Sequence, residues 1–495
     1  MSKIIIQNGN MCELDLPLKF AQKLYNEFAI RHPNAFYLRT RQRGMQNWDG
    51  KIHYITKTGQ FKIGLLPKVY DMCIEMGIKP KVVDMRQPLP KVSKVVTNIG
   101  KYKLRPEQER AVKSVINNRV GDIPFQIGVL DLTVNFGKTL IMTSLYLSYK
   151  KQLKTLLITN DSDWLNQARE EFKQYLPGED ITFVQGKVLN WSNFTIGMVQ
   201  SISRNMRFYQ KELSQIDMVL VDEADQGGSK QYQNVITRLF NTRIRIGLSG
   251  TIYMSKLAKD KVKNMNLECF FGKVIAEFKL KDSIKKGYST KTVVKMVPGK
   301  PWYGNWESDC ISYKEIYDDS ITNCYTAWLM AYNRLLWNLN QGRYPALVVC
   351  KHIAHCENLY KFFKKKLGDA YNIAYVHVNT PSKLRQQIMK DFREGKIDIL
   401  VSTTIIARGK NFPKLKYLLN TASMDSQEKS IQFLGRLVRT DESKNKVYLD
   451  DLHYPGNYLD RHGKHRKQYY QRQELKVILL DKLWKKHPNH SLIKS

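Results

Sequence analysis

Two short stretches of this sequence carry side chains that could bind and hydrolyse a phosphate ester. An apolar run ends abruptly at Asp222 and Glu223. A buried strand that ends in two carboxylates can place a magnesium ligand and a water-positioning base at the mouth of an α/β site. Upstream, Gly137, Lys138 and Thr139 follow a second apolar run. At the start of a helix, Lys138 can reach the β- and γ-phosphates of a nucleotide, the Thr139 hydroxyl can bind magnesium, and Gly137 lets the backbone approach the phosphates.

Neither stretch is specific by itself. Leu132 stands where the phosphate-loop pattern G-x-x-x-x-G-K-[ST] has its first glycine, and a Gly-Lys-Thr triplet arises easily by chance in a lysine-rich chain. Acidic residues at the end of an apolar strand are common in any sheet. The hypothesis of a nucleotide site therefore depends on the residues around these two stretches.

Polar residues elsewhere in the first half of the chain could complete such a site. Gln108, near Arg105 and ahead of the phosphate loop, can pair with an adenine edge because an amide both donates and accepts; an ordinary surface glutamine is the alternative. Further polar residues lie at predicted strand exits, namely Gln200, Ser201, Ser249 and Thr251. Such exits meet at one edge of a parallel sheet, where ligands bind, although they could equally be helix caps. Hydroxyls at 249 and 251 can hydrogen-bond the acidic pair and sense the γ-phosphate.

The second half of the chain repeats the alternation of strands and helices at residues 344–367, 372–378 and 396–420. Thr403 leaves a predicted strand, and a tight turn with Gly409 and Asn411 follows it. These residues again lie where the strands of a parallel sheet end.

A predicted helix over residues 430–440 spaces Gln432, Arg436 and Arg439 at i, i+4 and i+7, on one face. Arginine carries a permanent charge and a fork that matches phosphate oxygens, so two arginines from a second lobe could meet a γ-phosphate held by the first. The alternative is an arginine-rich surface helix.

These residues require two α/β lobes to position them. From Tyr102 onward, short apolar strands alternate with amphipathic helices, which predicts parallel sheets with crossover helices in lobes spanning 98–283 and 284–452. Residues 1–97 predict a small α+β unit, with a helix in 16–30, a hairpin in 51–66 and a lysine- and proline-rich linker at 79–94. Residues 453–495 predict a basic extension, either a DNA-contacting tail or a solvated helix.

The charge of the chain predicts a polyanionic partner. Lysine and arginine number 80 against 45 acidic residues, and the net charge of +35 is spread along the length, so nucleic acid is the first candidate and an anionic membrane surface the second. In the N-terminal unit, a basic and aromatic surface is predicted, with a solvated charged strand as the alternative; its residues are Arg39, Arg41, Arg43, Trp48 and Lys51.

No apolar run approaches the roughly 18 residues of a membrane-spanning helix, and the N-terminus lacks a secretory apolar region. We therefore expect a cytoplasmic protein. The seven cysteines fit reduced thiols better than a disulfide framework. Cys350 and Cys356 flank two histidines, but no second ligand pair stands at zinc-site spacing.

In order and spacing these stretches resemble the motif series of superfamily 2 helicases. Gln108 resembles the Q motif, residues 137–139 motif I, 157–167 motif Ia, 222–225 motif II, 249–251 motif III, 349–352 motif IV, 403–413 motif V and 432–439 motif VI. The N-terminal residues 39–55, which include the Trp48-Asp49-Gly50 turn, and 61–69 are similar to the N-terminal domain of the phage UvsW helicases, which are distantly like RecG. The series covers residues 102–450, most of the chain.

The resemblance implies two tandem RecA-like lobes, ATP and Mg²⁺ as cofactors, and a monomeric phage enzyme in the host cytoplasm that unwinds or branch-migrates branched DNA, such as replication forks and recombination or repair intermediates. Glu223, Arg436 and Arg439 are the implied catalytic residues. The implied nucleotide-binding residues are Arg105, Gln108, Gly137, Lys138, Thr139, Asp222, Gly409, Asn411 and Gln432, with Thr139 and Asp222 on the metal. Ser249 and Thr251 couple hydrolysis to movement, and Gln200, Ser201, Lys351 and Thr403 contact nucleic acid beside the basic N-terminal surface.

Three alternatives remain. The four letters of Asp222 to Asp225 also occur in DEAD-box RNA helicases, but those carry Ser-Ala-Thr where this chain has Ser249-Gly250-Thr251. A double-strand DNA translocase that never separates strands fits the same motifs. A basic nucleic-acid-binding protein with an inactive nucleotide fold is disfavoured because the set of lysine, carboxylates and arginines is complete.

Overall fold

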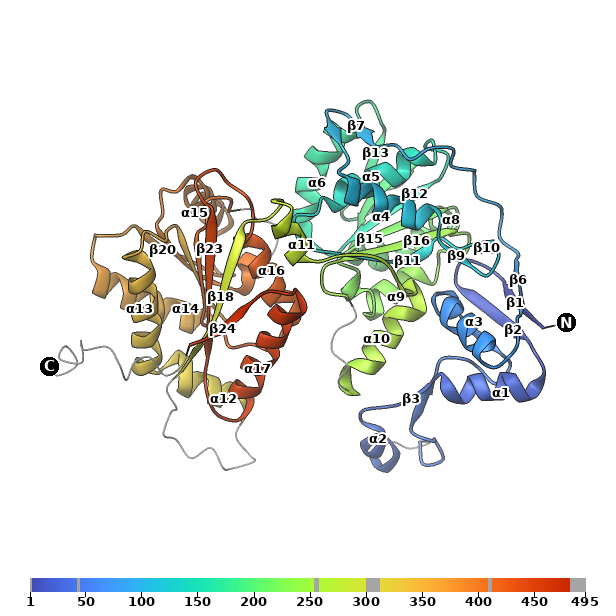
Figure 1. The fold of residues 1–495 in the computed structure, drawn as a ribbon, viewed down its shortest axis with the longest axis horizontal. Coiled ribbons are helices and arrows are strands. Elements are labelled where there is room, and N and C mark those ends of the chain that lie inside the picture. The colour runs from blue at the N-terminus through green and yellow to red at the C-terminus, as the bar shows by residue number, and fades with distance from the viewer. Residues whose placement is uncertain (1, 42–44, 253–257, 300–311, 408–411, 481–495) are drawn as a thin grey trace. The chain divides into compact units, whose positions relative to one another are not determined.

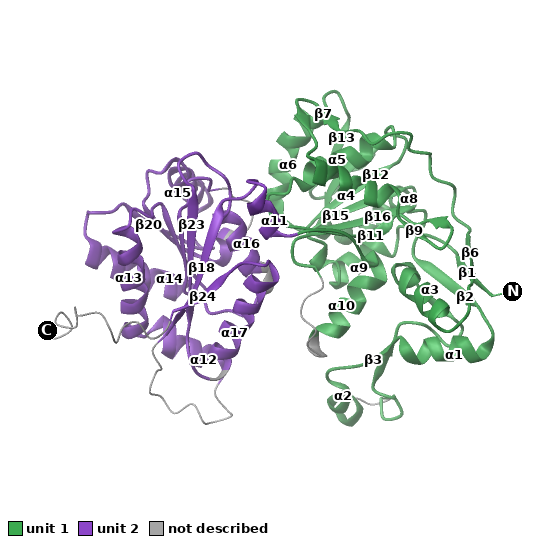
Figure 2. Cartoon of the chain, viewed as in Figure 1, with its two compact units in different colours: residues 1–278 green, residues 279–495 purple. Residues whose placement is uncertain are grey.

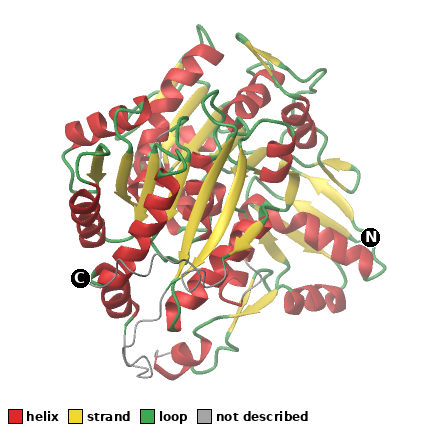
Figure 3. Ribbon diagram, turned by 60° about the vertical axis from the view of Figure 1, so that its left-hand side comes forward, coloured by secondary structure: helices red, strands yellow, loops and turns green. Residues whose placement is uncertain are grey.

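The computed structural model describes residues 2–41, 45–252, 258–299, 312–407 and 412–480 (Figure 1). The chain forms two compact units, residues 1–278 and 279–495 (Figure 2). A seven-stranded parallel sheet lies at the centre of each unit, with helices against its strands (Figure 3). The two sheets and the small N-terminal domain confirm the predicted architecture.

The first unit contains the larger part of the chain. Its central sheet has the order β13-β14-β12-β15-β16-β11-β17. The strands are β11 (Ile127–Leu132), β12 (Thr155–Thr159), β13 (Ile181–Val184), β14 (Phe194–Met198), β15 (Met218–Asp222), β16 (Ile244–Ser249) and β17 (Val274–Phe278). The helices are α4 (Pro106–Ile116), α5 (Lys138–Ser148), α6 (Ser162–Tyr175), α7 (Val199–Arg204), α8 (Gln210–Ser214), α9 (Lys230–Ile236) and α10 (Ala258–Phe271). Short helical turns are η2 (Met206–Phe208) and η3 (Ala224–Gln226), and two small ladders pair β7 (Asn98–Ile99) with β8 (Tyr102–Lys103) and β9 (Arg119–Val120) with β10 (Ile123–Pro124). β12 and β15 are buried along their whole length, which is why their sequences are continuous apolar runs.

The N-terminal domain is built on a four-stranded sheet of order β5-β2-β1-β6. Its elements are β1 (Lys3–Ile6), β2 (Met11–Asp15), α1 (Leu18–Glu27), β3 (Ala29–Arg31), α2 (Ala35–Arg41), β4 (Lys51–His53), β5 (Gln60–Lys62), η1 (Ile63–Leu65), α3 (Leu66–Glu75) and β6 (Lys81–Asp84). The chain turns at Thr58-Gly59 as predicted, and Ile55 pairs antiparallel with Phe61 beside the turn. Further from the turn the two arms separate into different sheets, because β4 pairs with β3 and β5 with β2. The predicted linker is wrong at residues 81–84, because this segment pairs in parallel with β1.

The N-terminal domain is bonded into the first lobe. The buried Arg245 of β16 donates from Nη2 to the Gly9 carbonyl at 2.6 Å and to Asn10 Oδ1 at 2.8 Å, and from Nη1 to the Phe270 carbonyl at 3.1 Å. A Cβ added to Gly64 would lie 2.1 Å from the Glu268 carbonyl oxygen, so the two backbones touch. One continuous apolar core joins the domain to the lobe.

The second unit has a sheet of order β20-β21-β19-β22-β23-β18-β24. Its strands are β18 (Lys291–Pro298), β19 (Ala346–Cys350), β20 (Ile373–Val376), β21 (Ile399–Thr403), β22 (Tyr417–Asn420), β23 (Lys446–His453) and β24 (Val477–Leu479). The helices are α11 (Leu280–Lys285), α12 (Tyr313–Tyr317), α13 (Tyr325–Leu339), α14 (Ile353–Leu367), α15 (Ser382–Glu394), α16 (Gln427–Leu437) and α17 (Asn457–Arg472), with the turns η4 (Asp318–Thr322) and η5 (Thr404–Ala407).

The predicted basic extension is part of this lobe as far as residue 479. β24 pairs with β18, and α17 packs against β23. Arg466 of α17 is fully buried and bonds the Asp451 carboxylate through Nε and Nη2, at 2.8 to 3.0 Å, while Tyr470 donates to the same carboxylate at 2.7 Å. The basic residues of this segment predicted an exposed extension, but one of its arginines, Arg466, is buried and neutralises a carboxylate inside the lobe.

Among the described residues, no helix has both the length and the apolar character to cross a membrane. The six described cysteines are free thiols, and five of them are buried. Of the two histidines between Cys350 and Cys356, His355 has its Nδ1 3.0 Å from the Tyr317 hydroxyl.

Candidate active site

Three adjacent strands of the first lobe bring the predicted nucleotide residues to one edge of the sheet. β15, β16 and β11 lie side by side and run parallel, with Asp222 in register with Leu248 and Asp131 with Ser249. The carboxyl ends of these strands therefore meet, and the phosphate loop, the acidic pair and Ser249 lie together. A Cβ added to Gly250 would lie 3.0 Å from the Leu132 carbonyl, which shows how closely the strand exits approach.

The loop between β11 and α5 has the backbone of an anion cradle. Asn135 and Gly137 have positive φ angles of 64° and 83°, and α5 begins at Lys138 directly after them. The Thr133 hydroxyl and the Asn135 side-chain amide are buried and have no hydrogen-bond partner. Buried polar groups are normally paired, so donors left unpaired beside a helix N-terminus fit phosphate oxygens. Leu132, at the position of the missing glycine, ends β11 in the core, 1% exposed, and the loop forms without that glycine.

Gln108 is bonded to this loop. It is 2% exposed; its Oε1 accepts from the Arg105 backbone N–H at 2.8 Å, and its Nε2 donates to the Phe136 carbonyl at 2.6 Å. Arg105 Nη2 donates to the same carbonyl at 2.6 Å. Both residues thus fix the start of α4 against the phosphate loop, a role that the sequence did not indicate, and the adenine contact stays a prediction.

The acidic pair lies at the end of β15. Asp222 is 6% exposed, and burial raises the pKa of its carboxyl, while Lys138 opposes that shift. Glu223 has a positive φ of 52°, which is rare outside glycine and asparagine and is typical of functional sites. The Tyr232 hydroxyl of α9 is buried without a hydrogen-bond partner, and burial, together with the negative charge of this acidic cluster, raises its pKa well above the usual value. No pattern in the sequence indicated Tyr232 as a residue of this site.

Ser249 bonds a different carboxylate from those expected. We predicted that the hydroxyls after β16 bond the pair Asp222 and Glu223, but Ser249 Oγ donates to Asp225 Oδ1 at 2.8 Å and accepts from the Thr251 backbone N–H at 3.1 Å. η3 turns the chain after Glu223 and brings Asp225 inward, where it is 3% exposed. Asp225 therefore links the acidic strand end to Ser249 and Thr251.

The second lobe places Thr403 at the carboxyl end of β21, and Arg436 on α16. The helix ends at Leu437, so the predicted helical spacing does not extend to Arg439, which lies two residues beyond. Lys444 bonds the end of this helix. Its buried Nζ donates to the Leu437 carbonyl at 3.0 Å and to the Leu415 carbonyl at 2.9 Å.

Two more features of this lobe bear on the prediction. Thr290 holds the segment after α16 by bonding the carbonyls of residues 438 and 439. Gln432, like Arg436 and Arg439, is half-buried. The predicted residues Gly409 and Asn411 lie outside the described residues.

The predicted nucleic-acid residues have varied surroundings. Arg39, Arg41 and Lys51 are exposed, and Arg41 lies over the Tyr37 ring at 5.1 Å, but the first two belong to a helix rather than a strand. Arg43 lies outside the described residues. Trp48 Nε1 donates to the Lys51 carbonyl at 2.9 Å, so that ring shapes the turn.

The remaining candidates are partly engaged within the protein. Ser201 Oγ accepts from the Gly186 N–H at 2.9 Å, and Gln200 Nε2 donates to the Asn160 carbonyl at 3.3 Å while its buried Oε1 has no hydrogen-bond partner. Lys351 Nζ lies 3.8 Å from the centre of the Tyr313 ring.

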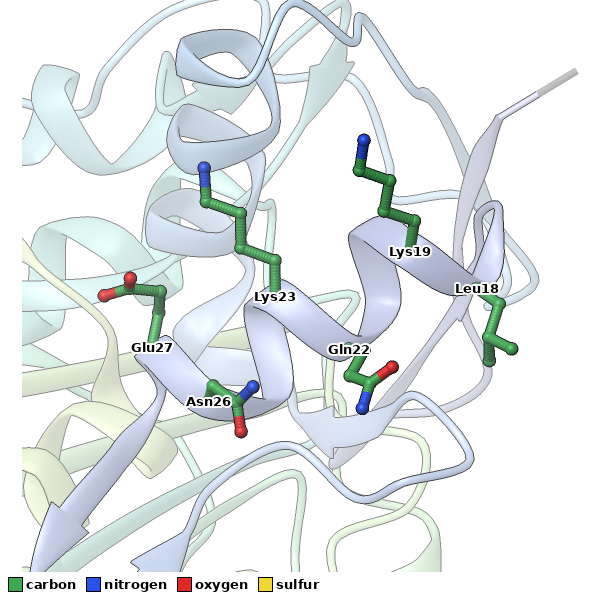
Figure 4. A pocket seen from close by; sticks show the side chains of 6 residues that line it. All are labelled: Leu18, Lys19, Gln22, Lys23, Asn26 and Glu27. Carbon is green, nitrogen blue, oxygen red and sulfur yellow. The ribbon is translucent and has the colours of Figure 1, made fainter.

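An open groove of about 590 Å³ lies along α1, lined by Leu18, Lys19, Gln22, Lys23, Asn26 and Glu27 (Figure 4). It contains none of the residues described above. We therefore place the active site at the strand edge and not in this groove.

The fold and the site together define an α/β phosphate-loop protein with two parallel-sheet lobes. Comparison with protein families assigns each lobe. Residues 101–254 match the family described as type III restriction enzyme, res subunit, and residues 329–441 match the helicase conserved C-terminal domain.

Two curated relatives align with both lobes. The chain is 22% identical to putative helicase 22 of a Sulfolobus islandicus filamentous virus, over 71% of this chain and 64% of the relative. It is 23% identical to the putative ATP-dependent helicase IRC3 of Saccharomyces cerevisiae, over 70% of this chain and 51% of the relative. The chain thus spans between half and two-thirds of the length of these relatives.

Solved structures share the fold. The type ISP restriction-modification enzyme LlaBIII bound to DNA aligns with a TM-score of 0.57 at 14% identity, over 81% of this chain and 34% of that one. Yeast Dbp5 bound to RNA and ADP BeF3 aligns with a TM-score of 0.51 at 13% identity, over 77% and 90%. T4 UvsW aligns over 97% of this chain and 98% of its own at 19% identity, with a TM-score of 0.45. The chain belongs to the superfamily 2 helicases, a class of ATP-dependent enzymes.

Proposed function

We propose that this chain hydrolyses ATP to unwind or branch-migrate branched DNA. The observation that carries the proposal is the meeting of the phosphate loop, the acidic pair and Ser249 at one sheet edge, with buried, unpartnered polar groups at Thr133 and Asn135. A phosphate ligand satisfies those groups. The donor set also fits Mg²⁺, which prefers carboxylate and hydroxyl oxygens, supplied here by Asp222 and Thr139.

In the proposed hydrolysis of ATP, each site residue of the first lobe has its own role. Bound ATP and Mg²⁺ supply a phosphoanhydride and the charge that neutralises it. Lys138 and the N-terminus of α5 hold the phosphates. Asp222 and Thr139 hold the metal, and Glu223, whose backbone is fixed in the left-handed region, orients the attacking water.

Arg436 and Arg439 of the second lobe stabilise the charge of the transition state. The bonds from Lys444 and Thr290 hold the end of α16 and the segment after it, so both arginines start from fixed backbone positions. An arginine in this role contributes about 10³ to 10⁵ in rate where it has been measured. Thr403, Gln200 and Ser201 contact the backbone of the tracked strand, so binding is independent of sequence.

Two observations favour DNA over RNA as the substrate. An alanine at position 250, as in the Ser-Ala-Thr motif, would fit only if the phosphate loop shifted by a few tenths of an ångström, because its Cβ would lie 3.0 Å from the Leu132 carbonyl. The N-terminal domain also presents Arg39, Arg41 and Lys51 to solvent on the same unit as the phosphate loop, which suits a duplex arm. An RNA helicase, or a double-strand DNA translocase without strand separation, is the alternative, since the structural relatives include both a DNA-bound and an RNA-bound protein. We propose that the enzyme acts as a monomer.

The test is the ATPase rate measured with single-stranded DNA, duplex DNA, forked DNA and RNA. We expect the greatest stimulation by forked DNA, and Lys138→Ala should abolish turnover while binding of DNA persists. Lys173→Ala, an exposed lysine of the same lobe, is the matched control and should retain the parent rate. Parent-level turnover in Lys138→Ala, or stimulation by RNA alone, contradicts the proposal.

A further inference from the structure

The second lobe carries a cluster of cations and aromatic rings that includes none of the motif residues. Three cations surround the Trp337 ring of α13: Lys295 Nζ at 4.9 Å, Arg334 Cζ at 5.0 Å and Arg343 Cζ at 4.8 Å from its centre. Arg343 also stacks on the Tyr448 ring at 3.6 Å, and Lys446 Nζ lies 5.7 Å from that ring. We call Lys291, Lys295, Arg334, Trp337, Arg343, Lys446 and Tyr448 the Trp337 patch.

The patch has a large excess of positive charge. Its one carboxylate partner is Asp450, 1% exposed, which accepts from Arg334 at 3.0 Å and from Tyr417 and Asn338 at 3.1 Å. Lys295, Arg343 and Lys446 form no ion pair with any carboxylate of the described residues; Arg343 donates to the neutral Asn338 Oδ1 at 2.8 Å. Lys291 and Lys446 are register partners on adjacent strands, an arrangement of like charges that weakens a sheet.

The pKa of Lys295 is lowered, in part by the same neighbouring positive charges. Burial lowers it first, and the charges of Arg334, Arg343 and Lys446 lower it further against the opposing pull of Asp450. An anion on this surface would relieve that repulsion. Because Trp337 remains 40% exposed, as does Tyr344, which directly follows Arg343, the ring and the charges are open to a ligand together.

The position of the patch separates it from the strand-tracking residues. Lys291 and Lys446 are the first residues of β18 and β23, whereas Thr403 and Lys351 lie at or beyond the carboxyl ends of β21 and β19. All these strands run parallel in one sheet, so Lys291 and Lys446 lie at the opposite end of the strands from Thr403 and Lys351. Of the motif residues, Arg439 lies nearer to the patch, because Thr290, which precedes Lys291, donates to its carbonyl at 3.0 Å.

We propose that the Trp337 patch binds the phosphate backbone of a second nucleic-acid segment, an arm of the branched substrate other than the strand that the motifs contact. This inference rests on the proposed function. Phosphates are the ligands that arginine and lysine clusters take without sequence preference, and the chain as a whole carries +35. Through this patch, the second lobe binds the substrate independently of the nucleotide.

The test is the charge-reversal pair Lys291→Glu with Lys446→Glu in the full chain. Both side chains are exposed and unpaired, so the variant should fold, which its thermal melting confirms. The control pair is Lys365→Glu with Lys366→Glu, two exposed lysines of α14 in the same lobe with the same change in charge. Binding of labelled forked DNA and of single-stranded DNA is followed by fluorescence anisotropy over a range of salt concentrations.

For the Lys291/Lys446 variant we expect forked-DNA binding to weaken several-fold and the slope of log affinity against log salt to fall by about 2, one unit for each lost phosphate contact. Binding of single-stranded DNA and the ATPase that it stimulates should match the parent. Equal weakening in the control pair, or parent-level fork binding in the test pair, overturns the inference and leaves an acidic protein as the ligand class for the patch. If the parent itself neither binds DNA nor hydrolyses ATP, the proposed function fails instead.

Discussion

Ser249→Ala tests whether the contact between β16 and Asp225 couples nucleic-acid binding to hydrolysis. The substitution removes the hydrogen bond of the hydroxyl to a carboxylate at 2.8 Å and the one from the Thr251 N–H at 3.1 Å, together with a 3.2 Å contact to the Thr251 hydroxyl. A bond to a charged group contributes about 1.5 to 3 kcal/mol and a neutral one about 0.5 to 1.5 kcal/mol. Ser249 is 2% exposed and Asp225 3%, so water cannot replace the lost partner. The sum, about 2 to 4.5 kcal/mol, is a large part of the stability of a typical domain.

Denaturant unfolding and ATPase assays separate the two consequences. We expect the free energy of unfolding of the first unit to fall by that amount, and the ratio of nucleic-acid-stimulated to basal turnover to fall with it. Ser144→Ala is the matched control: Ser144 is fully buried in the same lobe, and its hydroxyl donates to the Val96 carbonyl at 2.6 Å. That variant should lose about 1 kcal/mol of stability and keep the parent stimulation ratio.

A double-mutant cycle with Asp225→Asn isolates the pair. If Ser249 acts through Asp225, the double variant loses less stability and less stimulation than the sum of the single variants. A parent-level stimulation ratio in Ser249→Ala, or the same loss in Ser144→Ala, refutes the coupling role.

Three further predictions follow from charge, burial and packing. Affinity for DNA should fall linearly with the logarithm of salt concentration, and a flat titration would exclude a phosphate-tracking surface. Burial lowers the pKa of His355 from 6.5 to about 3, so as the pH falls the unfolded chain binds a proton that the folded chain excludes. The free energy of unfolding should therefore fall by about 2 kcal/mol between pH 7.5 and pH 5. His355→Gln should remove that share of the pH dependence, measured by urea unfolding. Gly250→Ala pushes a Cβ to 3.0 Å from the Leu132 carbonyl and 3.5 Å from Thr133 Cα, and the resulting shift of the phosphate loop should raise KM for ATP roughly fivefold, equivalent to about 1 kcal/mol, with an unchanged KM arguing against the close packing.

The sequence was sufficient to predict a strand and the site residue at its end wherever one segment carried both the apolar run and the polar residue that follows it. β11, β15, β16, β19 and β21 lie where the alternation predicted them, because strands buried on both faces must be continuously apolar. Parallel pairing then brings their carboxyl ends together without further information. The acidic pair and the phosphate loop could therefore be placed at one edge from local pattern alone.

Features that depend on distant pairing were not predictable. The turn at Thr58-Gly59 is visible in the sequence, but nothing local shows that the strands on either side of it pair elsewhere. Ser249 bonds Asp225 only because η3 folds the chain back after Glu223, and Arg439 lies off the helix because Lys444 holds the end of α16. Gln108 bonds the phosphate loop at Phe136, which is a contact across 28 residues of sequence.

The hydrogen bonds of Arg245 make the N-terminal domain part of the first unit. Burial lowers the pKa of its guanidinium to about 9, and no carboxylate of the described residues pairs with it, so its charge depends on the acceptors at Gly9, Asn10 and Phe270. Two of these acceptors belong to the N-terminal domain. Removing that domain would take away two of the three acceptors of Arg245 and would expose the apolar core that the domain shares with the lobe, so the lobe itself would lose stability.

The same arginine gives the arrangement a functional consequence. Arg245 and Ser249 lie on one strand, four residues apart, with the N-terminal domain bonded to the first and Asp225 to the second. A rigid strand between two bonded ends transmits a displacement of either end to the other. Under the proposed function, nucleic acid held by the exposed arginines of α2 would act on a domain that is fixed to the strand carrying Ser249. Substitution of Arg39 and Arg41, which leaves Arg245 satisfied, separates substrate binding from this mechanical link, whereas truncation of the domain removes both at once.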